Sequence, residues 1–177
     1  MSKCTRLVDV GRRQFLRGGA AATATVATAA AGMVPRSADA RASLALVDYP
    51  VHSLANEKDL RIDEPLFIHY PDADSPGVLL KLGTRVPGGV GRDGDIIGFS
   101  ILCPHKGYSL LWTTTDRTLN CPGHYSRFDA ENGGQQVWGH ATQNLPQFIL
   151  RVDPNGDIVA EGVDELIYGR LSNVLQS

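Results

Sequence analysis

The chain has 177 residues, 42% of them hydrophobic, so its length favours one domain with some additional sequence and its composition predicts a folded core. The formal net charge is −2 and no basic cluster lies beyond the first 40 residues, which argues against a nucleic-acid-binding protein. The 19 glycines and 10 prolines indicate many turns and favour β structure.

The first 40 residues have the composition of an export signal. Arg12 and Arg13 precede a weakly apolar run of Ala, Thr and Val, and residues 38–40 (Ala-Asp-Ala) offer a small-residue cleavage site. This order resembles a twin-arginine signal peptide, which exports proteins already folded and is common where a cofactor must be acquired first. We therefore expect residues 1–40 to be a signal and the protein to be periplasmic. A retained membrane anchor is the alternative, although the run is short and Ala-rich for a spanning helix.

Removal of this segment changes both the charge and the cysteine count. Lys+Arg falls from 17 to 11 and Asp+Glu from 19 to 17, which leaves a net charge of −6 on residues 41–177. Cys4 is lost, and only Cys103 and Cys121 remain. Two cysteines in an exported protein form a disulfide by default, so a Cys103–Cys121 disulfide is one open interpretation.

Residues 41–177 have the pattern of short strands separated by turns. The apolar runs lie at residues 45–54, 65–70, 77–83, 95–103, 147–153 and 157–163. Clusters of Gly, Pro, Asn and Asp separate them, and Asp-Pro-Asn-Gly-Asp at 153–157 predicts a hairpin. This spacing predicts an all-β domain of short antiparallel sheets. Residues 163–175 alone have helical spacing, and we expect a short C-terminal helix or an irregular arm there.

Two segments between the strands hold pairs of metal-ligating residues. Cys103 and His105 lie in "CPHKG", and after 15 further residues Cys121 and His124 lie in "CPGHYS". Proline and glycine stiffen both loops, so the loops can face each other and direct four side chains to one point. Two thiolates and two imidazoles suit either a zinc ion or an iron–sulfur cluster. A zinc-stabilised binding module without a redox role therefore remains an alternative.

The pattern Cys-x-His-x-Gly, a spacer and Cys-x-x-His resembles the two cluster-binding loops of Rieske 2Fe-2S proteins. The resemblance implies that Cys103 and Cys121 bind the inner iron of a 2Fe-2S cluster. It implies that His105 and His124 bind the outer iron. It further implies a Rieske-type all-β fold, with a cluster-binding subdomain at about residues 100–148.

Further positions are interpreted through the same resemblance. Residues 141–148, centred on Pro146, stand where Rieske proteins have a third loop that shields the cluster. Ser126 is expected to donate a hydrogen bond to a bridging sulfide. Phe128 stands where high-potential members have a tyrosine that donates to a cysteine sulfur, so a lower reduction potential is expected. The other histidines are interpreted as ordinary surface or core residues: His52, His69 and His140.

A narrower resemblance covers the leader, residues 133–152 and residues 160–175, which are similar to the small Rieske subunit of bacterial arsenite oxidase. That resemblance implies an electron-transfer subunit that is not catalytic alone. Its implied partner is a large molybdopterin subunit that also holds a 3Fe-4S cluster. The implied electron acceptor is a periplasmic cytochrome c or copper protein, and no stable membrane span is expected.

A Rieske subunit of a quinol-oxidising cytochrome bc complex is an alternative with the same fold. Such subunits normally keep a membrane anchor and have one more cysteine in each loop, joined as a disulfide. Those positions are Tyr108 and Gly123 in this chain, so that disulfide cannot form. We expect proline, glycine and backbone hydrogen bonds to the sulfurs to hold the loops instead.

Overall fold

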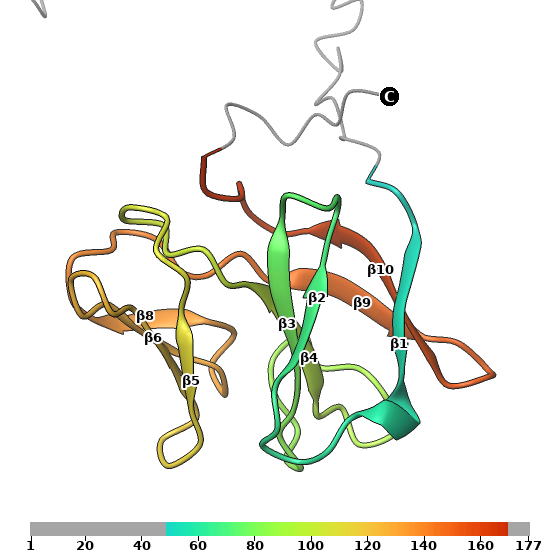
Figure 1. Cartoon of the computed structure of the whole chain (residues 1–177). Coiled ribbons are helices and arrows are strands. Elements are labelled where there is room, and N and C mark those ends of the chain that lie inside the picture. Colours follow the sequence, from blue (N-terminus) through green and yellow to red (C-terminus); the bar gives the residue numbers. More distant parts are fainter. Residues whose placement is uncertain (1–48, 170–177) are drawn as a thin grey trace, which may run out of the picture. The chain divides into compact units, whose positions relative to one another are not determined.

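The computed structural model describes residues 49–169, which form three small antiparallel sheets (Figure 1). The elements are β1 (His52–Asn56), the 3-10 helix η1 (Glu57–Asp59), β2 (Leu66–His69), β3 (Pro76–Lys81), β4 (Ile96–Ser100), β5 (Leu111–Thr113), β6 (Thr118–Asn120), β7 (Arg127–Asp129), β8 (Gln135–Trp138), β9 (Phe148–Val152) and β10 (Asp157–Val163). Their strand orders are β1-β10-β9, β2-β3-β4 and β5-β6-β7-β8. The expected all-β fold of short antiparallel sheets is confirmed.

Each apolar run of the sequence contains or overlaps one strand, and the structure adds four strands that the sequence pattern did not reveal. The predicted hairpin at 153–157 is present, because β9 and β10 pair antiparallel with Val152 opposite Ile158. The added strands are β5, β6, β7 and β8, which have only three or four residues each. Within residues 163–169 there is no helix, and residues 170–175 lie outside the described range, as do residues 1–40.

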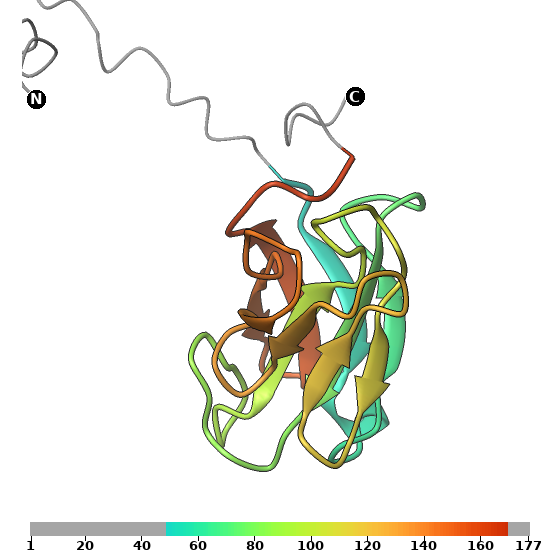
Figure 2. The ribbon, with the colours of Figure 1, turned by 90° about the vertical axis from the view of Figure 1, so that its left-hand side faces the viewer.

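The sheet β2-β3-β4 lies between the other two sheets (Figures 1 and 2), and its strands β3 and β4 are buried on both faces. Val78 and Leu80 of β3 belong to one hydrophobic core, together with residues of the β5–β8 sheet. Leu79, on the opposite face of β3, belongs to a second core with residues of β9 and β10. All five residues of β4 are buried. The sequence of β4, "IIGFS", does not alternate between apolar and polar residues, because both faces of the strand are covered.

Phe148 of β9 packs directly on glycines of two neighbouring strands. A Cβ on Gly77 of β3 would lie 2.6 Å from Cζ of Phe148, and a Cβ on Gly98 of β4 would lie 2.9 Å from its Cδ2. The Phe148 side chain is 1% exposed. The two glycines thus allow close packing of the first sheet on the middle one, and this contact supports β4, which leads into the first cysteine loop. No helix among the described residues is long and apolar enough to cross a membrane.

Replacement of Phe148 tests this packing. Phe148→Ala should lower the free energy of unfolding by about 3–5 kcal/mol, because it leaves a cavity between two sheets. The control is Ile149→Ala on the same strand, whose side chain is 52% exposed and whose loss should cost about 1 kcal/mol or less. Urea unfolding of both variants measures the difference, and equal losses would contradict the packing described here.

Candidate metal centre

The two cysteine loops share one backbone conformation. In the first, the Cys103 N–H donates to the Tyr108 carbonyl at 2.9 Å, and the Gly107 N–H donates to the Cys103 carbonyl at 2.8 Å. The equivalent bonds of the second loop run from Cys121 N–H to the Ser126 carbonyl and from Tyr125 N–H to the Cys121 carbonyl, at 2.8 and 3.1 Å. The paired Cys-Pro segments of the sequence are therefore a structural repeat, and each repeat fixes one cysteine.

Both loops need a residue in the left-handed region at the same position. Gly107 has a φ of 73° in the first loop, and Tyr125 has a φ of 60° in the second. Glycine adopts this conformation freely, whereas a side chain such as that of Tyr125 costs about 1–2 kcal/mol. The second loop therefore holds strain that the first avoids, and it presents a ring that is 73% exposed.

The two cysteines form one pair of donors. Both are free thiols, with exposed fractions of 0% for Cys103 and 2% for Cys121, so no disulfide joins them in this structure. Burial raises the pKa of the Cys103 thiol; the His105 and Lys106 N–H groups donate to its sulfur and lower the pKa, whereas the Cys121 thiol raises it. A bound cation would favour both thiolates, which is what a metal needs from its ligands.

The histidines form a second pair. The rings of His105 and His124 lie edge to face with centroids 4.7 Å apart. Burial, followed by the charges of His124, His140 and Lys106, lowers the pKa of His105, which favours the neutral ring with a lone pair on one nitrogen. Its Nδ1 atom is buried and has no hydrogen-bond partner in the described part of the chain. A buried nitrogen without a partner is costly, and a metal ion at this position would satisfy it.

These donors fit a 2Fe-2S cluster with two sulfur and two nitrogen ligands. Thiol lies beside thiol and imidazole beside imidazole, which matches the division in which two cysteines bind one iron and two histidines bind the other. Within residues 49–169, no three His, Cys, Asp or Glu side chains gather as ligands of a single metal ion. The four residues that the sequence singled out are therefore brought together as two adjacent pairs.

Ser126 and Phe128 lie under the site. The Ser126 hydroxyl accepts hydrogen bonds from the His140 N–H at 3.1 Å and the Ala141 N–H at 3.0 Å. These bonds use both of its lone pairs and leave its own proton free to be donated, as expected for a bond to a bridging sulfide. Phe128 is fully buried in the same hydrophobic core as Cys103 and Cys121.

A third loop contacts the site through His140. The His140 ring stacks on that of His105 with centroids 5.7 Å apart, and it lies 6.3 Å from that of His124. Pro146 is buried, and its carbonyl accepts the Ser100 N–H of β4 at 3.0 Å, which fixes the loop to the middle sheet. From its sequence context alone, His140 was interpreted as an ordinary surface or core residue. Its position directly before the expected shielding loop was the available signal.

The positions that form a disulfide in cytochrome bc-type Rieske proteins are in contact here without one. A Cβ on Gly123 would lie 2.8 Å from Cδ2 of Tyr108, so the Tyr108 ring rests on the Gly123 backbone. The same ring lies edge to face with His124 at 5.9 Å. An aromatic contact therefore joins the two loops, in addition to the backbone hydrogen bonds that were expected.

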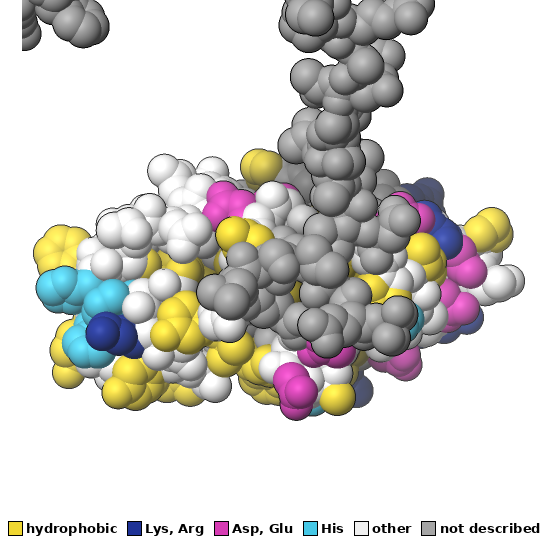
Figure 3. All heavy atoms as spheres, turned by 90° about the horizontal axis from the view of Figure 1, so that it is seen from above, with side chains coloured by type: hydrophobic (Ala, Val, Ile, Leu, Met, Phe, Trp, Pro, Cys, Tyr) yellow, Lys and Arg dark blue, Asp and Glu magenta, His cyan; other side chains and the backbone are white. Residues whose placement is uncertain are grey.

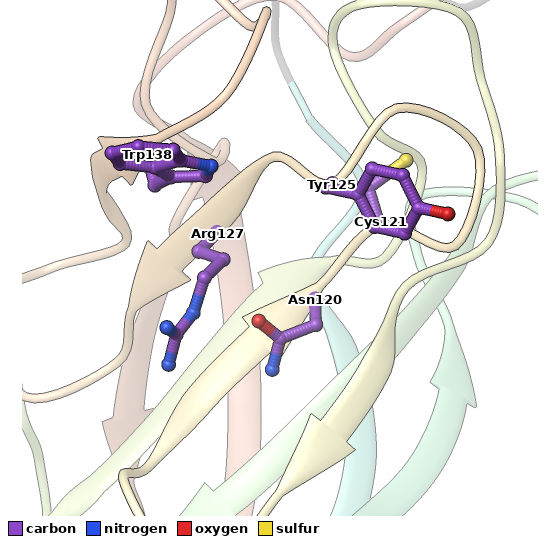
Figure 4. A pocket seen from close by; sticks show the side chains of 5 residues that line it. All are labelled: Asn120, Cys121, Tyr125, Arg127 and Trp138. Atoms are coloured by element: carbon purple, nitrogen blue, oxygen red, sulfur yellow. The ribbon is translucent and has the colours of Figure 1, made fainter.

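A pocket of about 400 Å³ opens beside Cys121. Figure 4 shows Trp138 on one side, Tyr125 and Cys121 on the other, and Arg127 and Asn120 between them. Trp138 is 67% exposed. The pocket thus brings exposed aromatic side chains close to a cysteine that is otherwise buried.

Comparisons with known proteins agree with this geometry. The Rieske [2Fe-2S] domain family matches residues 52–149. Iodate reductase subunit IdrB of Denitromonas iodatirespirans is 38% identical over 93% of this chain and 86% of that protein. The same subunit of Pseudomonas sp. (strain SCT) is 36% identical over 90% of this chain and 82% of that protein. The soluble domain of the Rieske protein II (soxF) from Sulfolobus acidocaldarius has the same fold, with a TM-score of 0.63 and 24% identity over 73% of this chain and 84% of that one.

The fold and the site define an iron–sulfur electron-transfer protein. The chain belongs to the Rieske [2Fe-2S] domain family, and its cofactor is a Rieske-type 2Fe-2S cluster. It is related over most of its length to a subunit of an oxidoreductase.

Single histidine substitutions distinguish the two expected ligands, His105 and His124, from the neighbouring His140. His105→Ala and His124→Ala should each abolish the Rieske signal in electron paramagnetic resonance of the reduced protein, because each removes a ligand of one iron. Cys103→Ala and Cys121→Ala should do the same. His140→Ala is the matched control, since its ring contacts both ligand rings, and it should keep the signal. A full signal in Cys103→Ala, or its loss in His140→Ala alone, would contradict the assignment.

The buried ring of Phe128 gives a prediction about the reduction potential. Phe128→Tyr should raise the midpoint potential by tens of millivolts if its hydroxyl donates to a cysteine sulfur, since about 1 kcal/mol for one hydrogen bond corresponds to roughly 40 mV for one electron. Phe128→Leu controls for altered packing because it adds no donor. Protein-film voltammetry measures both potentials. An equal shift in the two variants would show that the hydroxyl does not act on the sulfur.

Proposed function

We propose that this chain is the electron-transfer small subunit of a periplasmic molybdenum arsenite oxidase. Its partner is a large catalytic subunit with molybdopterin and a 3Fe-4S cluster, and its electron acceptor is a cytochrome c or a copper protein. The bound 2Fe-2S cluster supplies reversible one-electron transfer. The chain's own residues hold that cluster, cover it and present its histidine side to a partner, so the chain is not catalytic alone.

The observation that carries the proposal is the extent of the similarity to a subunit of another oxidoreductase. The chain matches the iodate reductase subunits over at least 90% of its length. A cytochrome bc1 Rieske subunit from Corynebacterium efficiens matches it over only 39% of this chain and 17% of that protein. The contact of Tyr108 with Gly123, where the bc-type disulfide would be, also supports this choice. The leader and the segments named above support arsenite oxidase within this group.

The surface around the histidines supports docking of a partner subunit. In Figure 3, histidine side chains gather at one end with hydrophobic side chains around them, and most acidic side chains lie away from that end. Residues 132–150 contain no charged side chain, and Lys106 is the one charge in residues 103–110. Depletion of charge with exposed aromatic side chains is typical of the centre of an interface. We therefore place Lys106, Gly107, Tyr108 and Tyr125 at the interface through which electrons pass.

A second candidate is the equivalent subunit of an iodate reductase, which the names of the similar subunits favour. In that enzyme the electrons flow toward the catalytic subunit, whereas in arsenite oxidase they flow away from it. The same 2Fe-2S site serves both directions, because no residue of this chain touches the substrate in either proposal. The catalytic partner therefore decides between the two functions.

Purification of the native complex tests the proposal. An affinity tag on this chain in its native host should recover a larger subunit and molybdenum, detected by metal analysis. The complex should reduce an external acceptor when arsenite is added, and the isolated small subunit should not. Reduction of iodate by the viologen-reduced complex without arsenite oxidation would establish the second candidate, and recovery without any molybdenum subunit would contradict both.

A further inference from the structure

The segment that follows β10 contacts both a hydrophobic core and the first cysteine loop. Ile167 is 2% exposed and belongs to the hydrophobic core that contains Phe148. The next residue, Tyr168, lies on Gly107: a Cβ on this glycine would be 2.3 Å from Cε1 and 2.9 Å from Cδ1 of the ring. Two adjacent residues therefore contact two different parts of the molecule.

Gly107 is the residue that closes the turn around Cys103. Its N–H donates to the Cys103 carbonyl at 2.8 Å, and its φ of 73° reverses the chain. The two residues before it, His105 and Lys106, direct their N–H groups at the Cys103 sulfur. Because these groups belong to one short turn, a ring that fixes Gly107 also fixes the direction of the hydrogen bonds to the sulfur.

We propose that Tyr168 is a positioning residue for the cluster. Its ring clamps the turn at residues 105–107 against the body of the protein, with Ile167 as the anchor, and thereby keeps the two N–H donors directed at Cys103. Hydrogen bonds to the cysteine sulfurs favour the reduced, more negative cluster, so this clamp raises the reduction potential. The inference rests on the Rieske site and is independent of the identity of the catalytic partner.

Limited trypsin digestion of the cluster-loaded full chain measures the clamp directly. Lys106 is exposed, and trypsin would cut its bond to Gly107, the residue on which the Tyr168 ring lies. Arg92, exposed in the turn before β4, provides a reference site away from this contact. In Tyr168→Ala, the rate of cleavage after Lys106 relative to that after Arg92 should rise about tenfold, which corresponds to about 1.4 kcal/mol of local opening.

Two further variants separate the ring from general stability. Tyr168→Phe keeps the ring and should retain the wild-type cleavage ratio. Leu166→Ala changes an exposed side chain of the same segment and should also leave the ratio unchanged. Mass spectrometry of the fragments identifies each cleavage site.

The midpoint potential distinguishes a positioning residue from one that only stabilises the fold, because loss of fold stability alone would not change the potential of the bound cluster. Tyr168→Ala should have a lower potential than the wild type and altered g values in electron paramagnetic resonance, and Tyr168→Phe should restore both. Equal increases in cleavage at the two sites would identify Tyr168 as a general stabiliser and overturn the proposal. Equal potentials for Tyr168→Ala and Tyr168→Phe would overturn it as well.

Discussion

The fold depends on one constraint: two thiols and one imidazole nitrogen are buried near one another at the edge of a hydrophobic core. Buried polar atoms without partners are costly, and His105 Nδ1 has no hydrogen-bond partner among residues 49–169. The Cys103 side chain faces the same problem, because burial opposes the thiolate form that iron requires, and the Cys121 thiol is buried beside it. Binding of a 2Fe-2S cluster resolves all three at once, so cofactor binding and local stability are coupled.

The rest of the fold supplies rigid support for those atoms. Cys103, Cys121 and Phe128 belong to the core that continues into β3 and β4. Strands β3 and β4 of the middle sheet are buried on both faces, and Phe148 fixes them to the next sheet across two glycines. The left-handed Tyr125 can therefore persist, because the surrounding contacts determine its conformation. The ring contacts of Tyr108 and Tyr168 with loop glycines hold the loops without a disulfide.

The four candidate ligands could be singled out from the sequence because their signal is local, and their binding to the cluster stays a prediction. Each cysteine and its histidine lie at a fixed spacing in a short loop rich in Pro and Gly. Such loops can be recognised without knowledge of the sheets that surround them. The long apolar runs likewise located β2, β3, β4, β9 and β10. Strands β5 to β8 were missed because three or four residues are too few to show alternation.

Other features depend on contacts between segments far apart in sequence. The place of His140 follows from Gly139, whose φ of 96° lets the chain pass directly over the Ser126 backbone. The contact of Tyr168 with Gly107 depends on how the C-terminal segment packs after β10. No periodicity or spacing in the sequence encodes either contact. The choice between arsenite and iodate also lies beyond these residues, since it depends on a catalytic subunit.

The central claim is that histidine nitrogens from both loops bind one iron of the cluster. Electron–nuclear double resonance of the reduced protein, labelled with ¹⁵N in histidine only, tests it most directly. The cluster spin should couple strongly to two histidine nitrogens, as in a Rieske centre. Absence of any histidine coupling, or a colourless protein that contains zinc and no iron, would contradict it.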